Sequence, residues 1–562
     1  MPRRMAAEQH HPPVRFDTHP DRYRHLALDF PPEYGGAVAR LQIDIPEDGG
    51  LRPGYPLKLN SYDLGVDIEI ADVTNRLRFE HPNVRALIIT SAKDRIFCSG
   101  ANIYMLGMSS HAFKVNFCKF TNETRFALEE MSEASGVHTL AALNGTASGG
   151  GYELAIACDE IVLVDDGSSA VSLPEAPLLG VLPGTGGLTR VVDKRKVRRD
   201  LADVFSTVAE GVRGKRALEW RLVDEAPAKG QFQSAIKRRV EAMVQRSKRR
   251  AFAPVILPAL SPTRGDNRVD YKYVTVEVDV AKRTAALTVK APSSDIPATL
   301  QQLIERGAAA WPIQAFRELD DALLDLRFNY PLVGTIAVKT SGDAKAVVAM
   351  DEMLTKQAEN GLVCEVTLLI KRVLKRLDMT ARSLFAIVDR GSCFAGSLFE
   401  LALASDRIYM LDDTEAAEGE APHIALSPMN DGPLPMANGL TRLQTRFLGD
   451  PLAARRAFEL RAPIGTQEAL AAGLVTFAPD DLDWDDEIRI AFEERASMSP
   501  DAMTGMEANL RFAGPETLET KVFGRLTAWQ NWIFQRPNAV GGRGALTLYG
   551  KPERPEFDFA RT

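Results

Sequence analysis

Hydrophobic positions in the first half of the chain fall into short runs separated by longer stretches of helical pattern. The runs 84–90 and 161–164 are rich in branched apolar residues, which is typical of strands buried on both faces of a sheet. Helical stretches such as 122–131 and 151–157 lie between such runs. Strands interleaved with helices predict an α/β fold of stacked ββα or βαβ units around a mainly parallel sheet.

The same pattern returns about 250 residues later in the chain. The segment 77–82 (LRFEHP) recurs as 326–331 (LRFNYP), and 153–159 (ELAIACD) recurs as 400–406 (ELALASD). A third set recurs with its internal spacing intact: residues 180, 183 and 187–190 return as 432, 435 and 439–442. The offsets are steady at 249, 247 and 252 residues, which indicates a duplicated domain.

The chain of 562 residues exceeds one ordinary hydrophobic core, and the repeat suggests where to divide it. Pro254, Pro258, Pro262 and Gly265 give the stretch between the two copies the composition of a linker. We therefore predict an N-terminal arm, a catalytic domain, a linker, a second copy and a helical C-terminal region, at residues 1–40, 41–250, 251–273, 274–480 and 481–562.

Composition narrows the class of protein. Hydrophobic residues make up 45% and charged residues 25% of the chain, and the net charge of −7 argues against a nucleic-acid surface. No run of about 18 apolar residues predicts a membrane span. Five scattered cysteines fit a reducing cytoplasm. No HExxH or Cys/His ligand spacing suggests a metal site, and no GxGxxG follows a strand, which excludes a dinucleotide-binding unit.

The segment 141–153 (AALNGTASGGGYE) carries the clearest chemical signal. A short apolar strand runs into Gly149, Gly150 and Gly151, and Glu153 follows on the opening turn of a helix. Glycines let a substrate carbonyl approach the main chain, and the helix start offers unpaired N–H groups. The upstream segment 96–102 (IFCSGAN) is another strand-to-glycine turn that can present a second N–H. Two such donors would form an oxyanion hole.

A second carboxylate, Glu175, follows 22 residues after Glu153 in a loop that can fold back to the same cleft. Two carboxylates close together repel, so one pKa should rise and provide an acid and a base at neutral pH. The sequence leaves open which glutamate is the acid and which the base. It also leaves open a nucleophilic thiol at Cys98, although no histidine lies near it in sequence.

With these motifs, and with the loop 174–190 (PEAPLLGVLPGTGGLTR), the chain resembles the crotonase (enoyl-CoA hydratase/isomerase) superfamily over about 57–225. The resemblance implies a ClpP/crotonase-like fold and a CoA thioester substrate. By motif, Ala101 and Gly150 are then the oxyanion-hole residues, and Glu153 and Glu175 are the catalytic acid/base pair.

The resemblance also implies CoA-binding positions, at Lys58, Asn60, Ser99, Asn102 and Ile103. Asn102 stands where the superfamily usually has an aspartate, which removes one negative charge beside the nucleotide. CoA is part of the substrate in this interpretation, so we expect no separate cofactor and no metal.

The second copy lacks these features. Ser397 stands in place of Gly150, Leu398 in place of Gly151 and Ser427 in place of Glu175. Glu400 survives without a partner carboxylate. We therefore expect the second copy to be a structural pseudo-domain.

The segment 16–25 (FDTHPDRYRH), the chain length and the segment 535–542 (QRPNAVGG) resemble the benzoyl-CoA-dihydrodiol lyase family, also named 2,3-epoxybenzoyl-CoA dihydrolase. That family implies ring-opening hydrolysis of 2,3-epoxybenzoyl-CoA with two waters, giving 3,4-dehydroadipyl-CoA semialdehyde and formate in aromatic degradation.

Two other functions stay open. One is an enoyl-CoA hydratase or isomerase acting on another acyl-CoA; the other is an inactive crotonase-like scaffold, against which the intact glutamates and glycines argue. Superfamily members often form trimers, and an attached second copy should cover part of that surface. We expect a cytoplasmic homodimer that binds neither nucleic acid nor membrane.

Overall fold

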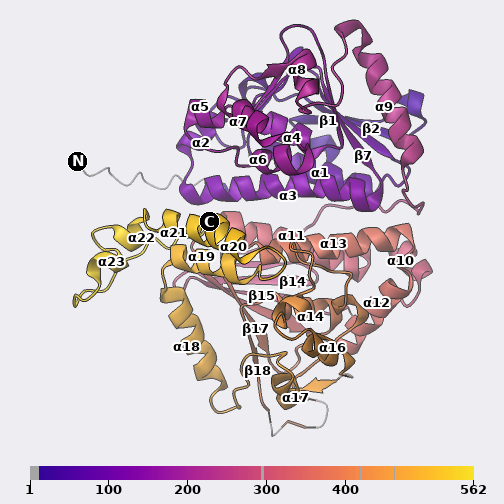
Figure 1. Cartoon of the computed structure of the whole chain (residues 1–562). Helices are drawn as coiled ribbons and strands as arrows, with labels where there is room; N and C mark the ends of the chain where they lie inside the picture. Colours follow the sequence, from indigo (N-terminus) through magenta and orange to yellow (C-terminus); the bar gives the residue numbers. More distant parts are fainter. Residues whose placement is uncertain (1–11, 293–295, 414–415, 418–419, 461–462) are drawn as a thin grey trace. The chain divides into compact units, whose positions relative to one another are not determined.

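The computed structural model describes residues 12–292, 296–413, 416–417, 420–460 and 463–562. The chain divides into two compact units, Met1–Ala259 and Leu260–Thr562, coloured indigo to magenta and pink to yellow in Figure 1. Among the strands that the structure describes, no sheet contains members of both units.

The larger sheet of the first unit has five strands in the order β1-β2-β4-β7-β9. β1 is antiparallel to β2, and the other neighbours are parallel. The strands are β1 (Leu26–Asp29), β2 (Val38–Ile43), β4 (Ala86–Ser91), β7 (His138–Leu143) and β9 (Glu160–Leu163). The apolar runs 84–90 and 161–164 thus correspond to β4 and β9, as predicted.

A second, smaller sheet has the order β11-β10-β8-β5, and β3 pairs with β6 beside it. These strands are β3 (Ser61–Tyr62), β5 (Arg95–Cys98), β6 (Gly100–Ala101), β8 (Gly145–Ser148), β10 (Ala170–Ser172) and β11 (Val212–Arg213). The chain passes from β7 in the large sheet to β8 in the small one and then into α4 (Gly150–Ala157). This is the ββα unit of the crotonase-like fold that the sequence predicts.

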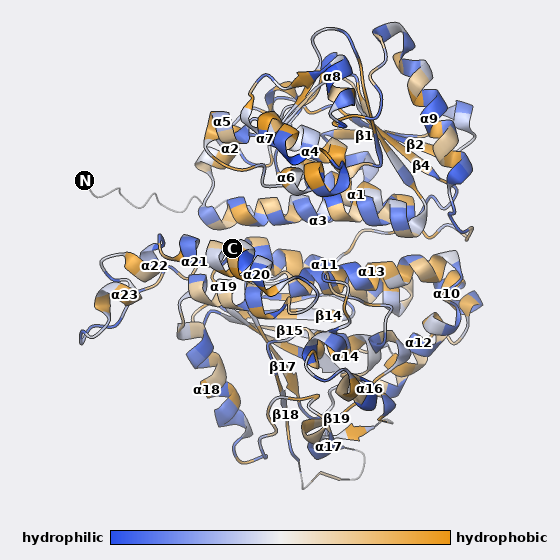
Figure 2. Ribbon diagram, viewed as in Figure 1, coloured by the Kyte–Doolittle hydropathy of each residue, from blue (hydrophilic) through white to orange (hydrophobic). Residues whose placement is uncertain are grey.

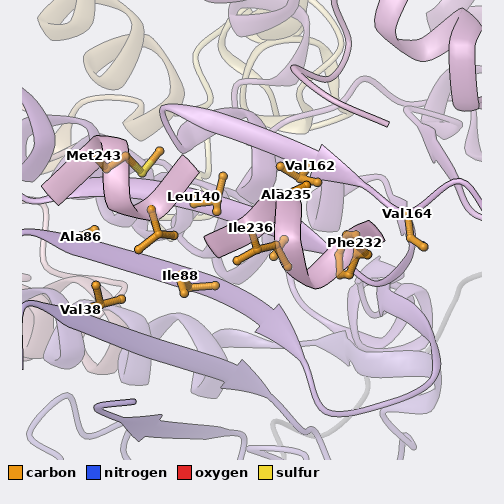
Figure 3. Close-up of a cluster of buried hydrophobic side chains, with 12 residues drawn as sticks. Val38, Ala86, Ile88, Leu140, Val162, Val164, Phe232, Ala235, Ile236 and Met243 are labelled. Carbon is orange, nitrogen blue, oxygen red and sulfur yellow. The ribbon is translucent and has the colours of Figure 1, made fainter. Parts of the chain in front are cut away.

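The other helices of this unit are α1 (Leu64–Phe79), α2 (Ile103–Met108), α3 (His111–Ser135), α5 (Glu175–Leu179), α6 (Gly187–Thr189), α7 (Arg199–Thr207), α8 (Gly214–Glu219) and α9 (Phe232–Arg246). One buried core lies between α9 and the large sheet, where Phe232, Ile236 and Met243 meet strand residues such as Ile88 and Leu140 (Figure 3). Hydrophobic residues concentrate along these strands, whereas α3 shows mixed hydrophobic and hydrophilic positions (Figure 2).

The second unit has a seven-stranded sheet in the order β12-β13-β14-β15-β16-β17-β18. Strands from β12 to β15 pair antiparallel, and β15 to β18 pair parallel. They are β12 (Thr263–Arg264), β13 (Arg268–Asp270), β14 (Val274–Asp279), β15 (Thr284–Lys290), β16 (Thr335–Ser341), β17 (Ser383–Val388) and β18 (Arg407–Met410). A separate pair joins β19 (His423–Ile424) to β20 (Ile464–Gly465).

Helices surround this sheet and form the C-terminal region, as expected. The former are α10 (Leu300–Arg306), α11 (Trp311–Asn329), α12 (Ala344–Lys356), α13 (Gly361–Asp378), α14 (Gly396–Leu403), α15 (Arg442–Arg446), α16 (Pro451–Glu459) and α17 (Thr466–Ala471). The latter are α18 (Trp484–Ser497), α19 (Pro500–Leu510), α20 (Leu518–Lys521), α21 (Thr527–Ile533), α22 (Pro537–Val540) and α23 (Ala545–Leu548). Across the described ranges, no helix combines the length and apolar character needed to cross a membrane.

The duplication is visible in the hydrogen-bonded pairs of the two units. The parallel strands β2-β4-β7-β9 correspond to β15-β16-β17-β18. Isolated bridges outside the strands recur as well: Val162 with Glu225 in the first unit corresponds to Tyr409 with Phe477 in the second. The two units therefore share the order and direction of four parallel strands in their main sheets.

Strands also occur in the two segments that the sequence analysis assigns to an arm and a linker. β1 and the start of β2 lie before residue 41 and belong to the large sheet of the first unit. β12 and β13 lie before residue 274 and extend the sheet of the second unit. Such short strands depend on the neighbouring strand rather than on local sequence, so composition gave no sign of them.

Candidate active site

The turn before α4 has a backbone conformation that requires glycine. Gly149 has φ 53° and ψ −129°, which side-chain-bearing residues rarely adopt. A Cβ atom built on Gly149 would lie only 2.8 Å from Oε1 of Glu175. Helix α4 begins at the next residue, so the N–H of Gly150 has no acceptor inside the helix.

The second glycine turn lies against the first. A Cβ on Gly100 would lie 2.6 Å from the Gly150 nitrogen, and a Cβ on Gly150 would lie 3.3 Å from the Ala101 nitrogen. Asn102 donates its N–H to the Tyr62 carbonyl at 2.9 Å across the β3–β6 pair. Successive N–H groups of a strand point to opposite sides, so the Ala101 N–H points away from β3. The structure thus brings the two predicted oxyanion donors together.

Glu153 lies in the first turn of α4 and is 2% exposed. Its Oε1 accepts N–H groups from Thr185 at 3.0 Å and Gly187 at 2.7 Å, and its Oε2 accepts the Thr185 hydroxyl. Burial raises the pKa of Glu153, while these donors and the charge of Arg125 act to lower it. The carboxylate is therefore fixed in orientation by its three donors, which offset only part of the effect of burial, so its pKa stays above the usual value.

Glu175 begins α5, on the loop after β10. Its Oε2 is buried and has no hydrogen-bond partner within the described part of the chain. Burial, and then the negative charge of Glu153, raise the pKa of Glu175 to about 7. The two predicted glutamates thus share one site with different environments.

A buried ion pair lies beside the donors. Arg125 of α3 donates to Asp67 of α1 at 2.8 Å, and both side chains are fully buried. The other guanidinium nitrogen of Arg125 donates to the Tyr62 hydroxyl at 3.4 Å. A Cβ on Gly150 would lie 2.3 Å from that hydroxyl, so Tyr62 also fixes the space beside the predicted oxyanion donor.

Five residues of the site have no role predicted from the sequence: Thr185, Gly187, Arg125, Asp67 and Tyr62. Thr185 and Gly187 lie inside the loop 174–190 that carries the superfamily resemblance, which was a usable signal. Arg125 and Asp67 meet across 58 residues, and nothing in the local sequence of either residue indicates the other.

The five predicted CoA-binding residues differ in what their side chains can do. Lys58 and Ile103 are exposed, and the Ser99 hydroxyl donates to the Lys58 carbonyl at 3.4 Å. The fully buried Asn60 side chain accepts the Ile45 N–H and donates to the Ser91 hydroxyl and to two main-chain carbonyls, those of Ile43 and Phe97. Asn102 caps α2 through its Oδ1 and donates to the Pro56 carbonyl at 2.8 Å. The two asparagines therefore shape the backbone of this region.

Cys98 is a poor candidate for a nucleophile. Its side chain is buried and donates to the Asn60 carbonyl at 3.0 Å. Burial raises the pKa of the Cys98 thiol to about 12, which leaves almost no thiolate at neutral pH. Its environment favours a packing role in the β5–β6 turn.

Among the described residues, no group of three or more His, Cys, Asp and Glu side chains could hold a metal ion.

The family model "Enoyl-CoA hydratase/isomerase" matches residues 54–261, the part of the chain that holds the N–H groups of Ala101 and Gly150 and both glutamates. Over 551 residues the chain is 54% identical to the benzoyl-CoA-dihydrodiol lyase of Aromatoleum evansii, covering 98% of each protein. The chain belongs to the benzoyl-CoA-dihydrodiol lyase family, within the crotonase superfamily.

Two further similarities are confined to part of the chain. The fatty acid oxidation complex subunit alpha of Shewanella loihica is 32% identical over 202 residues, which are 36% of this chain and 26% of that protein. A crystal structure of an enoyl-CoA hydratase from Geobacillus kaustophilus HTA426 is 26% identical, with a TM-score of 0.34, and covers 41% of this chain and 76% of that one.

Proposed function

We propose that the protein opens the ring of 2,3-epoxybenzoyl-CoA by hydrolysis with two waters, giving 3,4-dehydroadipyl-CoA semialdehyde and formate. The observation that carries the proposal is the pairing of Glu153 and Glu175 beside the Ala101 and Gly150 N–H groups. The 54% identity to the Aromatoleum evansii lyase, which extends over 98% of both proteins, supports this substrate rather than a fatty acyl chain.

In this proposal the N–H groups of Ala101 and Gly150 hold the thioester oxygen. Donors aimed at a developing oxyanion are each worth about 3–4 kcal/mol of barrier. CoA would follow the backbone around 58–60 and 99–103, with Lys58 and Ile103 presenting side chains to it. This orientation places the acyl ring next to the two glutamates.

The environments of the glutamates favour Glu153 as base and Glu175 as acid. Three donors support the Glu153 carboxylate, whereas Glu175 has a pKa of about 7 and a buried oxygen that meets no hydrogen-bond partner among the described residues. Glu153 removes a proton from water while the water oxygen forms a bond to an epoxide carbon. The carbon–oxygen bond breaks, and Glu175 gives its proton to the departing oxygen.

Ring cleavage then follows from the resulting diol, with Glu175 now a carboxylate and Glu153 protonated. The hydroxyl on ring carbon 2 loses its proton to Glu175 and becomes a formyl group as the bond to carbon 3 breaks. The electron pair passes through the two conjugated double bonds to the thioester oxygen. Protonation of the chain by Glu153, and tautomerisation of the enol at carbon 3, give a semialdehyde that still carries the formyl group beside the thioester.

The second water attacks the formyl carbon. The bond between the formyl carbon and the carbon that bears the thioester breaks. Formate leaves, and the electron pair of the broken bond forms a thioester enolate. The Ala101 and Gly150 donors stabilise this enolate until it is protonated. Every step is a hydrolysis or proton transfer, so we propose that the reaction needs no cofactor.

We further propose a cytoplasmic homodimer. Five free cysteines within the described part of the chain are consistent with a reducing compartment. Light scattering after size-exclusion tests the assembly: a mass near that of three chains would exclude a dimer.

The direct test incubates the purified protein with 2,3-epoxybenzoyl-CoA in water enriched in oxygen-18. We expect stoichiometric formate and semialdehyde by mass spectrometry, with at least one oxygen of the formate labelled from water. Crotonyl-CoA is the comparison substrate. Hydration of crotonyl-CoA without turnover of the epoxide would replace the proposal by an enoyl-CoA hydratase function.

A further inference from the structure

The second unit repeats the turn that carries the predicted oxyanion donor. Gly396 has φ 48°, close to the 53° of Gly149, and stands directly before Ser397, which corresponds to Gly150. Gly396 donates its N–H to the Ala425 carbonyl at 2.9 Å, just as Gly149 donates to the Ser172 carbonyl at 2.9 Å. The N–H of Ser397 is therefore the structural counterpart of the Gly150 N–H.

In the second unit this N–H is already bound to a carboxylate of the same unit. Ser397 donates its N–H to Oδ2 of Asp351 at 2.6 Å, and the hydroxyl of Ser427 donates to the same oxygen at 2.8 Å. Asp351 comes from α12 and is fully buried. A Cβ on Gly396 would lie 1.9 Å from that oxygen, so only a glycine leaves room for the carboxylate.

The counterpart of Glu153 is also engaged. Glu400 accepts from Asn430 at 2.7 Å and from Arg442 at 2.8 Å, and Arg442 pairs with Asp378 at 2.6 Å. In the first unit the corresponding Arg190 pairs instead with Glu129, at 2.8 Å, and makes no ion pair with the predicted base. The acid/base position of the second unit is therefore fixed in a buried ion-pair network.

We propose that the second unit contains a closed carboxylate-binding site, in which the Asp351 carboxylate occupies the position that the thioester oxygen takes in the first unit. The proposal goes beyond the proposed function and relies on it only for the correspondence between the two N–H groups. It means that each chain binds one acyl-CoA. It also means that the pocket accepts a small free carboxylate once the side chain of Asp351 is truncated.

The test is Asp351→Ala, which removes about the volume of one formate from the pocket. Thermal unfolding is measured at pH 8 in sodium formate and in sodium chloride of equal ionic strength. Burial raises the pKa of Asp351 to about 7, so this pH keeps the wild-type side chain largely ionised. We expect the variant to melt below wild type and to regain a few degrees with formate, beyond any effect of chloride.

Two controls separate the pocket from general effects of formate. Glu352→Ala changes the exposed neighbour on the same helix, whose carboxylate pairs with Lys356 at 3.2 Å. Asp351→Asn changes the charge while filling the space. Wild type and both controls keep the first unit's site, so formate binding there would appear in all three. None of the three should gain stability from formate.

An Asp351→Ala variant that responds equally to formate and chloride overturns the proposal, and so does an equal gain in Asp351→Asn. If Asp351→Ala does not fold without added carboxylate, its refolding yield in formate against chloride gives the same decision. Calorimetry with benzoyl-CoA adds a count: one site per chain is expected, and two would overturn the closed site. The formate test measures thermal unfolding and not turnover, so its result does not depend on whether the proposed reaction is correct.

Discussion

The pKa of Glu175 makes a prediction about how activity depends on pH. As the proposed acid, Glu175 must carry a proton in the free enzyme, and its pKa is about 7. The protonated fraction then falls to about one tenth at pH 8 and about one hundredth at pH 9. We expect kcat/KM for 2,3-epoxybenzoyl-CoA to fall about tenfold per pH unit above pH 7.

Glu175→Gln tests the source of this decline. An amide cannot supply the proton, so turnover at pH 7 should fall about 10²- to 10⁴-fold, the usual contribution of a positioned acid. The remaining activity should lose the decline above pH 7. Affinity for benzoyl-CoA should stay near that of wild type, because Glu175 is not proposed to hold CoA.

The assay is formate release from pH 6 to 9.5 in a constant-ionic-strength buffer, with Glu210→Gln as the exposed control. Glu210→Gln should keep both the rate and the pH profile of wild type. The reasoning about Glu175 is refuted if Glu175→Gln keeps near-normal turnover or the same decline above pH 7. The decline above pH 7 would then have to come from another group that must be protonated, because a raised pKa of the proposed base Glu153 lowers activity below that pKa and not above it.

Three further variants test the surroundings of the site. Arg125→Met removes the positive partner of the buried Asp67 charge, so urea unfolding should show a loss of about 3–5 kcal/mol. A loss near zero would mean that the Thr121 and Thr124 hydroxyls, which also donate to Asp67, are enough to stabilise its charge. Thr185→Ala removes one hydroxyl donor from Glu153 and should lower kcat/KM about 10- to 100-fold, with little change in melting temperature; unchanged kinetics would show that this donor is dispensable. Cys98→Ala should keep most of the wild-type rate of formate release, and an inactive but folded variant would restore thiol catalysis as an alternative.

The sequence predicted the parts of the site whose signals are local. Gly149, Gly150 and Glu153 follow one another at a strand-to-helix turn, so spacing alone shows that donors and a carboxylate meet. The structure places Glu175 beside them, as the loop length suggested. Whether these residues perform the proposed chemistry stays a prediction until the variants are measured.

Other features depend on contacts between distant segments, which spacing does not reveal. Arg125 and Asp67 form a pair only because α3 packs on α1 in the folded unit. Asn60 and Asn102 lie in the segments predicted to bind CoA, and spacing did not reveal that their side chains bond to neighbouring backbone. The short strand β1 was missed for the same reason, because it is defined by its pairing with β2.

In both units, a carboxylate oxygen lies where the side chain of the turn glycine would be. Gly149 faces Glu175 in the first unit, and Gly396 faces Asp351 in the second. The second copy has thus kept its glycine although it lacks the predicted catalytic pair. In duplicated enzymes of this kind, a glycine turn can persist because the backbone shape is inherited. The carboxylate that lies against the glycine is the better guide when activity is assigned to one copy or the other.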